Sequence, residues 1–145
     1  MTEAKTNPAK QYLKGYKALM LRRESLLREV ERMRESLTST TVQLKQDIVT
    51  GSGATDRIGN VVPQIVDAEA AIKPELEDIT ERIRRIFAAI NAAPDEMQKT
   101  VLTLRYIEGL EWLAISERIG YEISNTYIIH GRALVSVNQW LEGKK

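Results

Sequence analysis

A glycine between two short helical patterns is the feature that most constrains the fold of this chain. Residues 101–134 read VLTLRYIEGLEWLAISERIGYEISNTYIIHGRAL, with apolar residues at helical spacing before and after Gly120. Two steeply crossing helices need a small side chain where they touch, which Ser116 offers, and a residue at the turn that accepts a positive φ. The segment therefore predicts a helix-turn-helix, with helices at about 110–119 and 123–141.

The same segment carries a family resemblance. The runs LRYIEGLEWLAISERIGY and IIHGRAL resemble region 4 of bacterial sigma factors. They resemble more closely the sigma-region-4-like regulators of phages and prophages, the group that contains the late-gene activators RinA and ArpU. YLKGYK and a glycine-rich stretch ending in DRIG extend the resemblance more loosely over the whole chain. It implies a DNA-binding transcriptional regulator of phage genes, late genes among them, in the bacterial cytoplasm.

The second helix of the motif carries the predicted contact surface. Helical spacing turns Thr126, Ile129 and Ala133 inward. The outward-facing positions are Ile123, Ser124, Asn125, Tyr127, Ile128 and Arg132. By resemblance, these positions reach into the major groove of double-stranded DNA. Asn is able to pair with adenine through two hydrogen bonds, Ser and Tyr to bind phosphates or base edges, and Arg to hold a phosphate.

Two further residues are predicted as phosphate contacts, Arg118 and His130. The sequence HGRAL around His130 matches the phage pattern. Taken alone, however, this histidine fits a partly buried structural role better than a role in proton transfer. Trp112 is expected to pack the first helix of the motif against its neighbours.

The charge and composition of this segment leave an alternative open. Residues 95–145 hold six basic and seven acidic residues, whereas a DNA-binding module usually has a basic footprint. Sigma-like relatives usually have Ser or Thr at Glu122, and basic or polar residues at Ile123 and Ile128. An exposed apolar cluster is also typical of a protein interface. The alternative is an interaction module that binds a protein partner, such as a repressor or RNA polymerase.

A small terminase-like packaging subunit is a further alternative. Such subunits also combine a DNA-binding helix-turn-helix with helices that form oligomers. In those proteins the motif commonly comes first, whereas here it comes last.

Two long amphipathic patterns precede the motif. Apolar residues recur at steps of four and three over 12–37 and again over 58–90. We expect them to pack as an antiparallel hairpin in a region 1–93, followed by a helix-turn-helix domain at 94–145. Pairing with the same stripe of a second chain, in a coiled-coil dimer, is the alternative. The basic face of the first helix suits a solvated surface better than a DNA contact, because acidic residues are mixed into it.

The link between these patterns is expected to be a flexible loop at about 38–57. Thr38, Ser39, Thr40 and Thr41 disfavour helix, and GSGATD at 51–56 is typical of loops. Asn60 is expected to cap the second helix, with Pro63 in its first turn. Pro74 predicts a kink or a fresh helix start, and the residue before Pro94 should end the helix.

The composition argues against most kinds of catalytic and metal-binding site. The chain has no Cys and one His, which excludes thiolate chemistry and a multi-His metal site. Its carboxylates are spread as helix-surface charges rather than gathered in a pair. We therefore predict an all-α protein that is not an enzyme and needs no cofactor or metal. No apolar run reaches the length of a membrane span, so no membrane association is expected.

Overall fold

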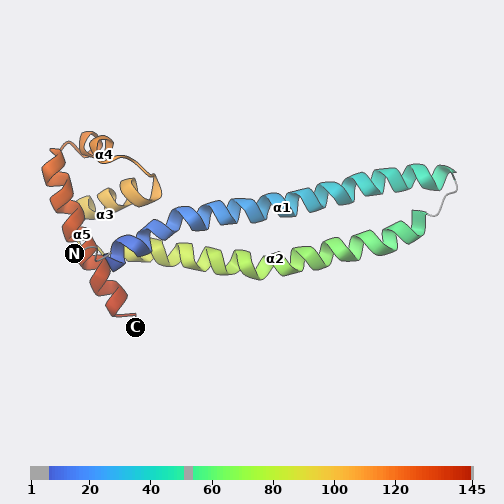
Figure 1. Cartoon of the computed structure of the whole chain (residues 1–145), viewed down its shortest axis with the longest axis horizontal. Coiled ribbons are helices and arrows are strands. Elements are labelled where there is room, and N and C mark those ends of the chain that lie inside the picture. Colours follow the sequence, from blue (N-terminus) through green and yellow to red (C-terminus); the bar gives the residue numbers. More distant parts are fainter. Residues whose placement is uncertain (1–6, 51–53, 145) are drawn as a thin grey trace. The chain divides into compact units, whose positions relative to one another are not determined.

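Every secondary-structure element in the described part of the chain is a helix. The computed structural model describes the backbone of residues 7–50 and 54–144, and the side chains of 7–39 and 63–144. The elements are α1 (Pro8–Thr50), α2 (Ala54–Asn91), α3 (Glu96–Leu102), the π-helical segment η1 (Thr103–Ile107), α4 (Trp112–Ile119) and α5 (Ile123–Glu142), as drawn in Figure 1. The predicted all-α class is confirmed. Within these ranges no helix is both long enough and apolar enough to cross a membrane.

The chain folds into two compact units. Residues up to 20 group with those from 81 onward, which we call the terminal unit, and residues 21–80 form the helical-pair unit. The boundaries differ from the predicted ones because the first turns of α1 and the last turns of α2 share a core with α5. The division of function between 1–93 and 94–145 stays a prediction.

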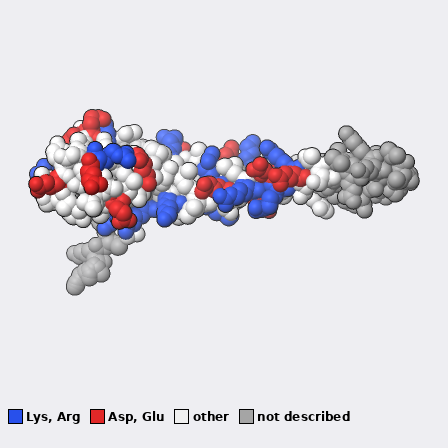
Figure 2. All heavy atoms as spheres, turned by 90° about the horizontal axis from the view of Figure 1, so that it is seen from above, with Lys and Arg blue, Asp and Glu red and all other residues white. Residues whose placement is uncertain are grey.

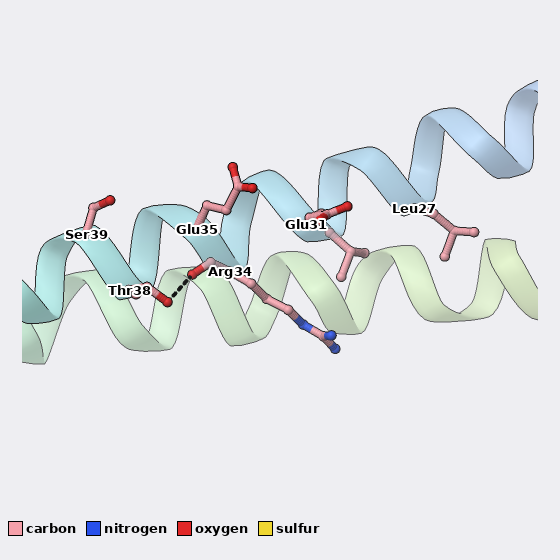
Figure 3. A pocket seen from close by; sticks show the side chains of 7 residues that line it. Leu27, Glu31, Arg34, Glu35, Thr38 and Ser39 are labelled. Carbon is pink, nitrogen blue, oxygen red and sulfur yellow. Dashed lines mark hydrogen bonds between the residues drawn. The ribbon is translucent and has the colours of Figure 1, made fainter.

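The predicted loop at about 38–57 is wrong wherever the structure describes the backbone of that stretch. Helix α1 continues through Thr38 to Thr50, and α2 already begins at Ala54. The Thr38 hydroxyl donates to the carbonyl of Arg34 at 3.0 Å, as Figure 3 shows. This bond to the preceding turn occupies the hydroxyl within the helix, so it does not draw the backbone into another conformation. Residues 51–53 of the expected GSGATD loop lie outside the described residues.

Helix α2 tolerates two prolines. It starts before the expected cap at Asn60, and it runs through Pro63 and Pro74 without the fresh start that was one expected outcome. A proline inside a helix costs about 3 kcal/mol. The apolar positions Ile72, Leu76 and Ile79 keep the same phase on both sides of Pro74 and are half-buried or buried. Packing along this face offsets the lost backbone hydrogen bond. The end of α2 at Asn91, ahead of Pro94, is confirmed.

In the helical-pair unit the two long helices run in opposite directions. Arg22 pairs with Glu75 at 2.8 Å, and Arg34, further along α1, pairs with Glu69, earlier in α2, at 3.1 Å. These ion pairs are exposed and stabilise the fold little. Burial of Leu26 and Ile79 contributes more. Figure 2 shows Lys and Arg interspersed with Asp and Glu along these helices, which agrees with the solvated role expected for the basic face of α1.

The terminal unit has one large core to which α1, α2, α3, η1 and α5 contribute. Its buried members are Ala9, Leu13, Ile86, Ala89, Ile90, Ala93, Leu102, Tyr106, Ala133, Leu134 and Val137. Polar contacts also tie the start of α1 to α5. The backbone N–H of Ala9 donates to Oδ1 of Asn138 at 2.8 Å, and Nδ2 of Asn138 donates to Oδ1 of Asn7 at 3.1 Å. Two residues far apart in sequence thus cap α1 together.

A second, smaller core joins α3, η1, α4 and α5. Its buried members are Val101, Leu104 and Ile115, with Leu110, Trp112, Ile119 and Ile129 packed around them. Helix α3 begins after Asp95, whose carboxylate accepts the backbone N–H of Met97 at 3.0 Å. Asp95 is thus the N-cap of α3, where its carboxylate satisfies an N–H that has no partner within the helix.

Candidate functional site

The chain reverses sharply between α4 and α5 at Gly120. This residue has φ 78° and ψ 21°, in the left-handed region where other residues cost roughly 1–2 kcal/mol. The backbone N–H groups of Gly120 and Tyr121 both donate to the carbonyl of Ser116, at 3.0 and 3.3 Å. The buried Ser116 hydroxyl donates in turn to the carbonyl of Tyr121. The predicted positive φ at Gly120 is confirmed, and Ser116 is buried beside the turn.

Helix α5 starts at Ile123, as predicted, and buries one side. Thr126 and Ala133 are fully buried, and Ile129 packs on the smaller core. Thr126 is a polar residue at a fully buried position. Its hydroxyl donates to the carbonyl of Glu122 at 3.0 Å, so the buried polar group is satisfied within the helix.

The opposite side of α5 is exposed. The large apolar side chains there keep much of their surface accessible, with exposed fractions of 39% for Ile123, 47% for Tyr127 and 52% for Ile128. Ser124, Asn125 and Arg132 are exposed as well. All six predicted contact residues are thus exposed on α5. We call this set Ile123, Ser124, Asn125, Tyr127, Ile128 and Arg132 the α5 face.

Within α4, the turn and α5, three exposed large apolar residues outside this set were not predicted as contact residues: Leu113, Tyr121 and Val135. Val135 lies seven residues after Ile128, and this spacing places it on the same side of the helix. Periodicity could therefore have found it. Leu113 on α4 and Tyr121 in the turn gave no such signal, because their exposure depends on how α4 packs.

The structure contradicts the predicted phosphate contact of His130. Its side chain is buried, shares a hydrogen bond of 2.7 Å with the Tyr106 hydroxyl and lies with its ring centroid 4.5 Å from that of Trp112. Burial, followed by the nearby charges of Lys10 and Arg105, lowers the pKa of His130 to about 4. The imidazole is therefore neutral at pH 7 and is not available to a phosphate. The structural role that the sequence favoured for this histidine agrees with the contacts.

The Trp112 ring packs against the ring of Tyr127. The two rings meet edge to face, with centroids 5.2 Å apart and an interplanar angle of 63°. The Arg105 guanidinium lies 4.7 Å from the Trp112 ring centroid and donates to the carbonyl of Leu110 at 2.9 Å. The packing role expected for Trp112 is confirmed. Because such aromatic pairs have a preferred geometry, Tyr127 is positioned on the α5 face rather than free to swing.

The α5 face carries little charge. Arg132 is its one cation, and the helix begins after Glu122. Arg118, the other predicted phosphate contact, is exposed on α4 and lies 4.0 Å from Glu108, which partly neutralises it. The face thus combines hydrogen-bonding groups with exposed apolar side chains. Among the described residues, no three His, Asp or Glu side chains gather closely enough to hold a metal ion.

Comparison with known proteins adds no relative. No protein-family model, no curated protein and no solved structure matches this chain. Its function is therefore inferred from its own residues.

Proposed function

We propose that this chain is a DNA-binding transcriptional regulator of phage or prophage origin that controls phage genes. In this proposal α4, the turn at Gly120 and α5 form a helix-turn-helix of sigma region 4 type, carried by a long helical hairpin of α1 and α2. The observation that carries the proposal is the α5 face, which offers an amide, hydroxyls and a guanidinium on the exposed side of one helix. A helix with such side chains fits the major groove of duplex DNA.

Each exposed group has a partner in a duplex. The Asn125 amide matches the N6 and N7 edge of adenine, and the methyl groups of Ile128 match the C5-methyl of thymine. Ser124 and Tyr127 are suited to phosphate oxygens or base edges, and Arg132 to a phosphate. With so few cations, binding would depend on base contacts more than on counterion release.

Fluorescence anisotropy with duplex fragments of the phage genome tests the proposal. Specific binding supports it, and absence of binding at low salt contradicts it.

We further propose that the protein works as a dimer, paired through the helical-pair unit. A groove of about 400 Å³ there is lined mainly by apolar side chains of both helices, together with Arg34, Glu69 and Lys73. Leu27 and Val66 stay 40% and 57% exposed. A two-fold partner would cover them and fix the spacing of two recognition helices on DNA.

Light scattering of the full chain tests this pairing. We expect a mass twice the 16.4 kDa of one chain, and we expect Leu27→Glu with Val66→Glu to return it to one chain, because charges would enter an apolar contact. Leu113→Glu, at an exposed leucine on α4, is the control and should stay dimeric. A strict monomer at high micromolar concentration would exclude the dimer.

A second candidate function is supported by the apolar part of the α5 face. Ile123, Tyr127 and Ile128, with Val135 beside them, are more apolar than a surface that reads DNA needs to be, and such clusters mark protein interfaces. In this alternative the face binds a protein partner, such as a repressor or RNA polymerase itself.

Ile128→Asp separates the two functions. If the face binds protein, this variant should lose capture of the purified partner by at least tenfold, because a carboxylate would be buried without a partner. Asn125→Ala, which removes a base-reading group and no apolar contact, should capture the partner as the parent chain does. Unchanged capture by Ile128→Asp contradicts the alternative.

A further inference from the structure

A groove in the terminal unit lies where α1, α2 and α5 meet, and its floor is aromatic. Its volume is about 520 Å³, and its floor is formed by Tyr12, Trp140 and Leu141. The Tyr12 and Trp140 ring centroids lie 6.1 Å apart, with the rings inclined at 53°. Both rings pack against the large core, yet they still line the groove. The floor therefore offers an apolar surface on which a side chain from outside can pack.

The rim of the groove is basic. It carries three cations, which are Arg84 and Arg85 on α2 and Lys144 after α5, and one carboxylate, Glu81. Glu81 accepts from Arg84 at 2.6 Å and from Arg85 at 3.1 Å, and these bonds lower the pKa of the Glu81 carboxyl to about 2. Three cations and one ionised carboxylate leave the rim with a net charge of +2. The Lys144 ammonium lies over the Trp140 ring, 5.2 Å from its centroid.

This groove and the α5 face lie on different parts of the same helix. The α5 face occupies the first half of α5, whereas Trp140 and Leu141 lie near its end. Trp140 follows Ile128 by twelve residues, which is about 18 Å along the helix axis. The groove is therefore a surface separate from the α5 face.

We propose that this groove, the Trp140 groove, docks an acidic segment of a partner protein that packs one apolar side chain against Tyr12, Trp140 and Leu141. The anchor side chain supplies most of the affinity, since buried aromatic contacts dominate interfaces. The carboxylates around it meet Arg84, Arg85 and Lys144, which set the orientation and speed the encounter. The proposal deepens the proposed function, because a regulator on DNA then has a second surface for recruiting another protein.

The same features argue against a nucleic acid in the groove. A base needs an open ring face on which to stack. The Trp140 ring has Lys144 over it and Tyr12 beside it. The Glu81 carboxylate, held ionised by its two arginines, would also repel a phosphate backbone that followed the rim. An acidic peptide can place its carboxylates beside the cations and keep them away from Glu81.

Fluorescence anisotropy with the full chain tests the proposal. The probe is a fluorescein-labelled peptide of Asp and Glu around a central Leu-Phe pair. We expect it to bind, to weaken with salt, and to lose at least tenfold in affinity when Arg84→Glu is combined with Lys144→Glu. Both side chains are at the rim, so the reversal should leave the helical circular dichroism unchanged. Arg28→Glu, at an exposed cation on α1 in the helical-pair unit, is the matched control and should bind normally.

The control peptides and a duplex titration decide between the outcomes. A peptide with Ala in place of the Leu-Phe pair, or Lys in place of the acidic residues, should bind at least tenfold more weakly. The proposal fails if the parent chain does not bind the acidic peptide, or if Arg28→Glu weakens binding as much as the rim reversal. It also fails if an oligonucleotide rather than the peptide binds through Arg84 and Lys144.

Two sets of variants test the proposed DNA-binding function separately from the groove. The rim reversal should keep specific duplex binding, whereas Asn125→Ala with Arg132→Ala should lose it and keep the peptide. Peptide binding without any duplex binding would reject the DNA-binding function and support the groove.

Discussion

Replacing Asn125 and Arg132 together by Ala is expected to weaken binding to a specific duplex by about tenfold to a thousandfold. A bidentate contact of an amide with adenine contributes about 1–3 kcal/mol of discrimination, and loss of a phosphate contact adds to this. Both side chains are exposed on α5, so the fold should not change. Anisotropy titrations over a range of salt concentrations measure the effect.

The single variants give different signatures. Asn125→Ala should lower affinity for the specific site and leave non-specific binding nearly unchanged. Arg132→Ala should weaken binding to all sequences and reduce the slope of log affinity against log salt by about 0.9 for each protomer bound. Arg28→Ala is the matched control, because it removes an exposed cation from α1. If Arg28→Ala weakens binding as much as Arg132→Ala, the duplex lies along the basic face of α1, and the proposed role of α5 is wrong.

Acid is expected to destabilise the terminal unit through His130. Its pKa is about 4 in the folded state against about 6.5 in an unfolded chain, so below pH 6.5 the unfolded chain binds more protons. Stability therefore falls as pH decreases from 6.5 toward 4, by about 2 kcal/mol at pH 5 and about 3 kcal/mol at pH 4. Above pH 6.5 this contribution is constant. Urea unfolding followed by circular dichroism, at a series of pH values, measures it.

His130→Gln is the control for this pH dependence. Its amide does not titrate and is able to keep a hydrogen bond to the Tyr106 hydroxyl. Carboxyl groups titrate equally in both proteins, so the difference between the two pH profiles isolates the imidazole. The difference should grow below pH 6.5. Parallel profiles between pH 7 and pH 4 would show that His130 is protonated as easily in the folded protein as in the unfolded chain.

The sequence predicted the helices around the turn to within two or three residues, and the physical reason is local. Burial of Thr126 and Ala133 follows from a period of 3.6 residues, and the positive φ at Gly120 follows from the one residue type that accepts it readily. The six residues of the α5 face were predicted from the same period. Whether that face binds DNA or protein stays a prediction, since exposure alone fits both.

The prediction that failed most clearly, the loop at about 38–57, rested on propensity. Thr and Ser favour other conformations when they are considered singly. In α1 the Thr38 hydroxyl bonds to the Arg34 carbonyl, and in α2 a continuous apolar face compensates for Pro74. Apart from proline, helix propensities differ by about 1 kcal/mol or less per residue, so packing along a whole helix outweighs them.

The sequence by itself determined that the chain is helical, that α4 and α5 meet at a turn, and which side of α5 is buried. These are properties of neighbouring residues, and the spacing of apolar side chains encodes them. Only the tertiary structure decided that His130 is enclosed by Tyr106 and Trp112, and that Tyr12 and Trp140 meet under a basic rim. Both arrangements join residues far apart in the chain. Their pKa values, exposure and contacts depend on which helices pack together, and no local pattern specifies that.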